Sequence, residues 1–251
     1  MTASLTQDRP PIGSMTPVHR LLVSRRDPET RQYQSLGFLS LVDGRYRFAY
    51  LRLAAMDSSF RPLIGFPDPT RSYESEQLFP IFAERVMSPR RPDRRAVLEA
   101  LALGLDAEPF EVLARSGGRR VGDAIELVPV PDPCSGTLSV DYFVHGVRYM
   151  SPSAQRLITS LQSGEVLHLV PEPTNPVDHR AVLVTCTGDV RLGYVPTPLL
   201  DLVCAIKEPQ TYVLRANGPE VGFHYRLLVS SSGLISDGAT PFAGPDWETV
   251  D

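Results

Sequence analysis

The sequence has little cysteine and histidine and almost no lysine, and it has no long apolar run. Its three cysteines form no C-x-x-C pair, and their odd number argues against a disulfide framework. The five histidines are scattered along the chain, so the spacing that a zinc site requires is missing. We therefore expect neither a metal nor a cofactor.

Membrane signals are also missing from the sequence. No apolar stretch reaches the roughly 18 residues that a membrane-spanning helix needs. The first residues, MTASLTQDRPPIGSM, lack the charged-then-apolar layout of a signal peptide. These two absences lead us to expect a cytoplasmic protein with no membrane partner.

Enzyme motifs are absent as well. The sequence contains no G-x-x-x-x-G-K-[ST] phosphate loop and no H-R-D or D-F-G kinase set, so Gly117, Gly118 and Gly122 are interpreted as turn glycines. His179 and Glu172 have no third, well-spaced partner for a metal or acid–base site. We expect no kinase, ATPase or nuclease activity.

The sequence also lacks a broad basic character. Its net charge is −4, and residues 136–251 carry 7 Lys and Arg against 12 Asp and Glu. Phosphate neutralisation over a large surface is therefore not supported, and any nucleic-acid site must be small and local. One arginine-rich stretch, with Arg90, Arg91, Arg94 and Arg95, is the alternative surface for such binding.

The 251 residues are enough for two modest domains, each with its own core. The segment LVPVPDPCSGT, residues 127–137, contains three prolines and a glycine between two patterned regions, and we interpret it as a linker or an edge connection. The predicted domains are residues 17–131 and 135–230. Flexible tails are predicted at 1–16 and 231–251.

The first region is predicted to be a sheet with helices. Asp43-Gly44 joins two alternating apolar runs and predicts a hairpin, because this pair tolerates positive φ. Ser72 is a candidate N-cap for a helix through YESEQLFPIFAERV, which Pro80 would kink or end. Two more helices are predicted, in DRRAVLEALALG and in EPFEVLARSGG.

The second region is predicted to be rich in short strands. A strand-like start, TLSVDYFVHGVRYM, leads to a helix that Ser151 or Ser153 caps. Five or six short strands with two helices in about 100 residues are typical of a small closed or half-closed β-barrel. The predicted fold class is therefore α+β.

Three motifs of the second region, HGVRYM, LQSGEVLHLVPEPTNPVDHRAVLV and VRLGYVP, resemble the HIRAN domain in content, order and spacing. The core pattern G-x-x-L-x-L-x-x-E-P-x-N-P-x-D-x-x-A-[IV] runs from Gly164 to Val182, and the resemblance covers residues 137–230. Family members are fused to remodelling helicases or stand alone in bacteria, and this chain is similar to the bacterial type. The resemblance implies an OB-like barrel that captures the 3′ end of single-stranded DNA.

The resemblance also implies roles for five residues. Arg148 and Tyr149 match the family's arginine–aromatic pair at the terminal nucleotides, where the aromatic face stacks a base. Asp178 matches an aspartate that accepts a hydrogen bond from the 3′-hydroxyl, and Asn175 matches an amide beside it. Tyr194 replaces a histidine near the phosphates and could donate to one. An ionised Asp178 can only accept, so it would favour a 3′-hydroxyl over a 3′-phosphate.

The first region, residues 19–131, resembles the N-terminal subdomain of HipA-type toxin kinases. The resemblance is carried by YQSLGFLSLVDGRYRFAYL, by RPLIGFP and by the helices that end in GGRRVGDAIELVPV. The kinase lobes do not follow, because the chain passes directly into the HIRAN-like region. This resemblance implies a scaffold that could contact a protein partner.

The leading hypothesis is a DNA-end binding module that acts in DNA repair, processing or defence. Two alternatives stay open. One is a protein-interaction scaffold related to HipA-type toxin–antitoxin systems, in which the barrel is structural. The other is a non-catalytic subunit of a separately encoded helicase or nuclease. The turn from Glu172 to Asp178 could also serve the fold alone, with Asp178 bonding local backbone.

Overall fold

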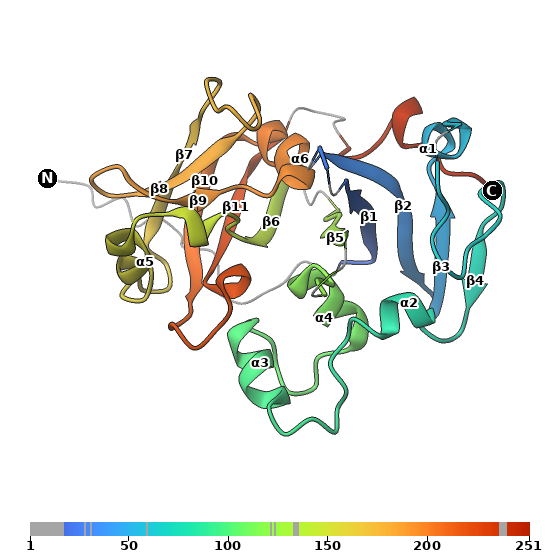
Figure 1. Cartoon of the computed structure of the whole chain (residues 1–251), viewed down its shortest axis with the longest axis horizontal. Helices are drawn as coiled ribbons and strands as arrows, with labels where there is room; N and C mark the ends of the chain where they lie inside the picture. The colour runs from blue at the N-terminus through green and yellow to red at the C-terminus, as the bar shows by residue number, and fades with distance from the viewer. Residues whose placement is uncertain are drawn as a thin grey trace, which may run out of the picture.

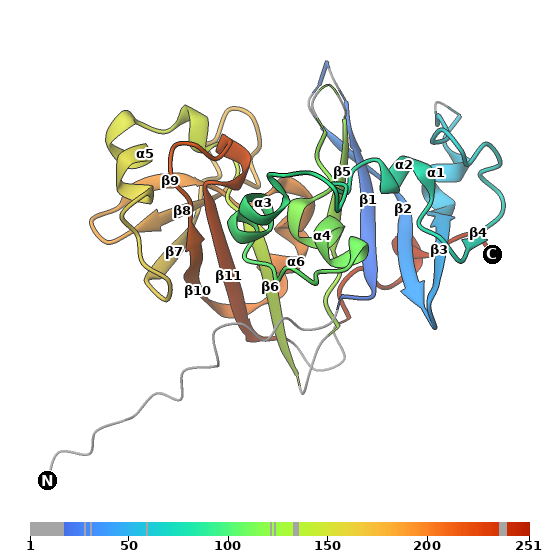
Figure 2. The ribbon, with the colours of Figure 1, turned by 90° about the horizontal axis from the view of Figure 1, so that it is seen from below.

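The computed structural model describes residues 18–251 except 28, 31, 59, 121, 123, 133–135 and 236–239. Two antiparallel sheets lie side by side, and α3 and α4 lie over their junction (Figures 1 and 2). The α+β class is confirmed in this general form. The predicted tail at 1–16 lies outside the described residues.

The first sheet has the strand order β4-β3-β2-β1-β5. Its strands are β1 (Arg20–Arg26), β2 (Tyr33–Val42), β3 (Arg45–Tyr50), β4 (Tyr73–Ser75) and β5 (Ile125–Pro129), and its helices are α1 (Arg52–Met56), α2 (Pro80–Ala83), α3 (Arg94–Ala100) and α4 (Pro109–Ser116).

The second sheet has the strand order β6-β11-β10-β7-β8-β9. Its strands are β6 (Thr137–Phe143), β7 (Val166–Pro171), β8 (Val182–Cys186), β9 (Val190–Tyr194), β10 (Lys207–Ala216) and β11 (Leu227–Leu234). The α-helices α5 (Pro152–Ile158) and α6 (Leu200–Ala205) accompany it, with the short 3₁₀ helices η1 (Val147–Tyr149), η2 (Thr197–Leu199) and η3 (Phe223–Tyr225). A fourth 3₁₀ helix, η4 (Pro245–Trp247), lies against the first sheet.

The predicted barrel does not close fully among the described residues. The order of the second sheet ends at β6 and β9, and these edges meet in one isolated bridge, between His145 and Tyr194. Both backbone hydrogen bonds of this bridge measure 2.8 Å. The chain just after β6 therefore touches β9 at a single point, without a ladder.

Several turn and helix-end residues that were predicted from the sequence have the predicted conformation. Asp43 and Gly44 adopt φ values of 51° and 75° at the turn between β2 and β3. Helix α4 begins with Pro109 at its first position and ends at Gly117, whose φ is 69°. Ser151 accepts a hydrogen bond from the backbone N–H of Ala154 and caps α5. The hairpin and these two helices are confirmed.

The helix predicted over YESEQLFPIFAERV is largely wrong. Residues Tyr73–Ser75 form β4 and pair with β3, and α2 begins only at Pro80. Proline has no N–H to give to a helix interior and suits a first helical position. The Tyr73 ring packs edge-on against Phe66 at 5.0 Å, a tertiary contact that favours the strand.

Of the two interpretations of residues 127–137, the edge connection holds at the start of the segment and the linker does not. Leu127 and Val128 are buried in β5, which pairs with β1. Pro129 ends β5, and an edge strand tolerates a proline because its outer N–H groups need no partner. The prolines therefore mark a sheet edge at this point, and the connection from β5 to β6 begins only beyond Val130.

The C-terminal segment is not the predicted free tail. Residues 231–234 belong to β11, and residues 240–251 return to the first sheet, where the C-terminus lies beside β3 and β4 (Figure 1). Trp247 packs against Phe38 and Phe242, with ring centroids 6.2 and 4.7 Å apart. Sparse aromatic side chains anchor this segment, and they leave no periodic pattern in the sequence.

The hydrophobic core crosses the junction between the sheets. One cluster of buried side chains contains Leu22 and Phe38 from the first sheet together with Val140 and Val229 from the second. Another joins α3 and α4 to strands of the second sheet. Division into two separable domains stays a prediction. In the part of the chain described here, no helix is long and apolar enough to cross a membrane.

The single tryptophan offers a test of the docked C-terminal segment. Trp247→Ala removes both ring contacts and should lower the free energy of unfolding by about 2–4 kcal/mol. Glu248→Gln, which loses only an exposed ion pair with Arg52, should cost less than about 1 kcal/mol. In the native protein, Trp247 fluorescence and circular dichroism should follow one denaturation curve. A fluorescence transition well before the loss of circular dichroism would contradict the docking.

Candidate nucleic-acid interface

The turn between β7 and β8 is built by the side chain of Asn175. Its Oδ1 accepts hydrogen bonds from the backbone N–H groups of Val177 and Asp178, at 2.9 and 3.2 Å. Its Nδ2 donates to Glu172 Oε2 at 2.7 Å. Every polar atom of the Asn175 amide is thus used to hold the turn, as Asn in a turn commonly is.

Tyr194, on β9, joins the same network. Its hydroxyl donates to Glu172 Oε2 at 2.9 Å, and Arg191 donates to Glu172 Oε1 at 2.7 Å and to the Tyr194 hydroxyl at 2.8 Å. Hydrogen bonds from Asn175 and Tyr194 lower the pKa of Glu172, so the carboxylate is ionised at neutral pH. The Tyr194 proton is already used here, and the cation beside the turn is Arg191, which is itself paired with Glu172.

Asp178 has one oxygen in use. Its Oδ1 accepts a hydrogen bond from the backbone N–H of Arg180 at 2.9 Å, which is a local turn contact. The Arg180 side chain pairs with Asp201 instead. In the part of the chain that the structure describes, Oδ2 of Asp178 has no hydrogen-bond partner, so one carboxylate can hold the turn and accept from a ligand.

Arg148 and Tyr149 lie on η1, directly after Gly146, whose φ is 75°. The Tyr149 side chain is 75% exposed, and its ring faces no other described aromatic ring. The Arg148 guanidinium lies 5.9 Å from the centre of the Phe223 ring. Gln155 on α5 donates to the carbonyls of Arg148 and Met150 and ties η1 to that helix.

Two glycines allow η1 to lie beside the Asn175 network. A Cβ on Gly193 would sit 2.4 Å from the carbonyl oxygen of His145, and one on Gly146 would sit 3.3 Å from the Tyr194 ring. The backbones can form the His145–Tyr194 bridge only because Gly193 has no side chain. Asn175 and Tyr194 are brought into direct contact, whereas no contact between Tyr149 and Asp178 occurs among the described residues.

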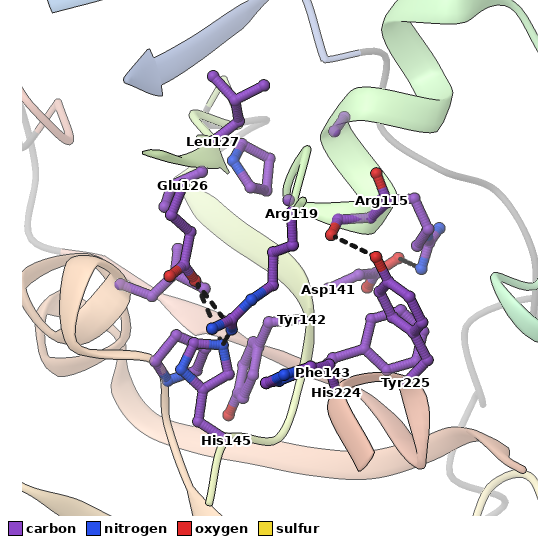
Figure 3. A pocket seen from close by; sticks show the side chains of 17 residues that line it. Arg115, Arg119, Glu126, Leu127, Asp141, Tyr142, Phe143, His145, His224 and Tyr225 are labelled. Carbon is purple, nitrogen blue, oxygen red and sulfur yellow. Dashed lines mark hydrogen bonds and ion pairs between the residues drawn. The ribbon is translucent and has the colours of Figure 1, made fainter. Parts of the chain in front are cut away.

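The side chain of His145 points away from this interface into a buried ionic cluster at the sheet junction (Figure 3). Its Nε2 lies 3.2 Å from Glu126 Oε1 and 2.9 Å from an Arg119 nitrogen. Glu126 Oε2 accepts a hydrogen bond from the Tyr33 hydroxyl at 2.7 Å. Burial raises the pKa of Glu126, but His145, Arg119 and Tyr33 outweigh burial and lower it to about 2. Burial and the nearby carboxylate raise the pKa of Tyr33.

The cluster borders a pocket of about 40 Å³ between the sheets. On its other wall, Arg115 of α4 pairs with Asp141 of β6 at 3.1 Å (Figure 3). A volume of this size holds a few water molecules, far below the roughly 300 Å³ of an ordinary ligand site. The pocket is therefore a polar junction. Among the described residues, no group of three or more His, Cys, Asp and Glu side chains is placed to hold a metal ion.

Residues 137–199 match the family model of the HIRAN domain. A crystal structure of a protein from Lactobacillus plantarum is 21% identical and covers 39% of this chain and 99% of that chain, with a TM-score of 0.29. The HIRAN domain of human HLTF is 19% identical and covers 39% of this chain and 81% of that chain, also with a TM-score of 0.29. Among curated proteins, no match was found.

This part of the chain is a HIRAN domain, which points to nucleic-acid binding in general. The sequence analysis missed Arg191, which lies beside the turn, and the cluster around His145, which lies behind η1 at the sheet junction. Arg191 lies in the motif VRLGYVP, three residues before Tyr194, and this place in the motif could have indicated that it lies near the turn. Glu126 is far from His145 in the sequence, and no local signal could pair them.

The buried cluster predicts a pH dependence of stability. The folded-state pKa of Glu126 lies below its ordinary value of 4.5, so its contribution is complete above pH 4.5 and is lost as the pH falls towards 2. The stability difference between the native protein and Glu126→Gln should therefore shrink by about 3 kcal/mol in that window. Denaturant unfolding at several pH values measures it. A difference that does not change with pH would refute the ionised cluster.

Proposed function

We propose that the protein binds single-stranded DNA at its 3′ end through η1 and the turn that ends at Asp178. The observation that carries the proposal is that this chain has both an exposed ring, Tyr149, and a carboxylate oxygen of Asp178 that no described residue engages. An exposed aromatic face stacks a base of any identity. A carboxylate accepts from a hydroxyl and repels a phosphate.

The surroundings fit a short, end-specific contact. Val177 is 82% exposed beside Asp178 in the turn and can neither stack a base nor donate a hydrogen bond, so the stacking contact falls to Tyr149 alone. Arg148 on η1 and Arg191 on β9, which is paired with Glu172, supply the cations of the proposed site. Few positive charges are available beyond these two, so affinity should come from the terminal nucleotide.

The proposed role is binding without catalysis. We also propose that residues 19–131 have a HipA-like fold. In this proposal the first region supports the DNA-end site and does not contact DNA itself. Its extensive packing against the second sheet agrees with a supporting role. A role in repair, processing or defence follows from 3′-end capture, because free 3′ ends arise in all three.

The first test compares end chemistries. The native protein should bind a 3′-hydroxyl oligonucleotide more tightly than the same oligonucleotide with a 3′-phosphate. Asp178→Ala should lose about ten- to a hundredfold in affinity for the 3′-hydroxyl end, because one charged hydrogen-bond partner is removed. Asp178→Asn keeps an oxygen for the Arg180 N–H and removes the repulsion, so it should discriminate much less between the ends.

Melting curves of the two Asp178 variants provide the control. Asp178→Asn should melt close to the native protein, because the local turn contact survives. If Asp178→Ala melts much earlier and still discriminates between the ends as the native protein does, the turn is structural and the DNA-end proposal fails.

A second test addresses stacking. Tyr149→Ala should weaken binding by about 1–3 kcal/mol because one base loses its platform. Tyr149→Phe keeps the ring and should bind almost as well as the native protein. Equal losses in both variants would show that the hydroxyl, and not the ring, makes the contact.

A third test uses salt. The slope of log affinity against log salt should be shallow, corresponding to about one to three neutralised phosphates. The alternative surface is poor in available cations, since Arg91 pairs with Asp93, Arg95 pairs with Glu99, and Arg94 donates to backbone carbonyls. A slope for about six or more phosphates would point to a different surface.

A further inference from the structure

We infer that the first sheet positions η1 through the contact between Glu126 and His145, so that residues outside the HIRAN match set the strength of base stacking. Glu126 and His145 are positioning residues and touch no DNA in this scheme. The inference rests on the proposed function for its consequence in DNA binding, whereas its structural part can be tested without DNA.

The connection between Glu126 and η1 is short. The His145 side chain lies 3.2 Å from Glu126 Oε1, and its backbone forms the two-hydrogen-bond bridge with Tyr194. Gly146 comes next, and η1 begins at Val147. Only Gly146 separates His145 from η1, the helix that carries Tyr149, so a displacement of His145 should displace η1 as well.

Glu126 is itself held firmly by the first region. Its side chain is 9% exposed, and its backbone pairs with Ser24 of β1 in the β5–β1 ladder. The Tyr33 hydroxyl and Arg119 approach the carboxylate from β2 and from the chain after α4, at 2.7 and 3.8 Å. A buried charge that loses its partner is strongly unfavourable, so His145 is confined wherever Glu126 is fixed.

A second contact reaches η1 through η3. The Tyr225 hydroxyl donates to the carbonyl of Ser116, the last residue of α4, at 3.4 Å. Phe223, two residues earlier, carries the Arg148 guanidinium over its ring at 5.9 Å. The first region thus approaches η1 from two directions, once through His145 and once through η3.

The other half of the interface is supported differently. The side-chain hydrogen bonds of Glu172, Asn175, Asp178 and Arg191 all go to residues of the second sheet and its turns. The first region therefore supports η1, which carries Tyr149, through His145 and η3, and none of these hydrogen bonds ties it to the turn that carries Asp178. A change at Glu126 should affect η1 and not the turn, whereas a general loss of stability would affect both.

Hydrogen exchange measured by mass spectrometry tests the positioning directly. In full-length Glu126→Gln, exchange of peptides covering residues 143–150 should accelerate by about tenfold or more, because local opening becomes easier. Peptides covering 172–178 should exchange as in the native protein. Unchanged exchange at 143–150 would overturn the inference.

Two further variants keep the test decisive. Tyr33→Phe removes one hydrogen bond to Glu126 without removing its charge, so it should give a smaller acceleration at the same peptide and serves if Glu126→Gln does not fold. Tyr50→Phe is the matched control, because the Tyr50 hydroxyl is a buried hydrogen-bonding group of the same sheet with partners at Leu63 and Phe66. If Tyr50→Phe accelerates 143–150 equally, the effect is general destabilisation and the inference is wrong.

Binding of a 3′-hydroxyl oligonucleotide completes the experiment. Glu126→Gln should reduce affinity by roughly two- to thirtyfold and leave the ratio between 3′-hydroxyl and 3′-phosphate ends unchanged. Combined with Tyr149→Ala, it should add little further loss, since both variants remove the same contact. When Glu126→Gln is combined with Asp178→Asn, the losses of binding free energy from the two substitutions should add in full. The opposite pattern of additivity would contradict positioning of η1.

The two proposals can fail separately. If the native protein binds no oligonucleotide, the proposed function fails, and the exchange of 143–150 still decides whether Glu126 positions η1. If the native protein binds 3′ ends and Glu126→Gln changes neither exchange nor affinity, the proposed function stands and the positioning role is refuted.

Discussion

The close approach of two backbones at Gly193 is the constraint on which the interface depends. With a Cβ at this position only 2.4 Å from the His145 carbonyl oxygen, no other residue could allow the bridge between His145 and Tyr194. That bridge joins the open edges of the second sheet. It also places η1 next to the Asn175 network and directs the His145 side chain towards Glu126. A single close contact therefore links the sheet edge, the interface and the junction.

The junction combines apolar packing with buried charges. A cluster of apolar side chains from both sheets provides the nondirectional part of the contact. The Glu126–His145 and Arg115–Asp141 pairs provide directional contacts across it, at 3.2 and 3.1 Å. Buried ion pairs add little net stability, because desolvation offsets their attraction. Their effect here is to fix how one sheet lies against the other, and through His145 that geometry extends to η1.

Local signals in the sequence predicted local structure well. The Asp43-Gly44 hairpin, the α4 ends at Pro109 and Gly117, and the HIRAN motif each depend on neighbouring residues. Where the structure differs, long-range contacts decide: the Tyr73 strand forms because β3 accepts it, β5 forms because β1 needs an edge partner, and the C-terminal segment is anchored by Trp247. The site followed the same rule, since the motif contained Asn175 and Tyr194, whereas the link to Glu126 exists only in three dimensions.

Mapping the bound oligonucleotide onto the protein tests the central claim most directly. Backbone amide shifts of the full-length protein, measured by NMR during titration with a short 3′-hydroxyl oligonucleotide, locate the contact residue by residue. The proposed interface predicts the largest changes at 147–149, 175–178 and 191–194, with smaller changes at His145 and Glu126. Changes confined to the first sheet or to α3, with none at 147–149 or 175–178, would contradict it.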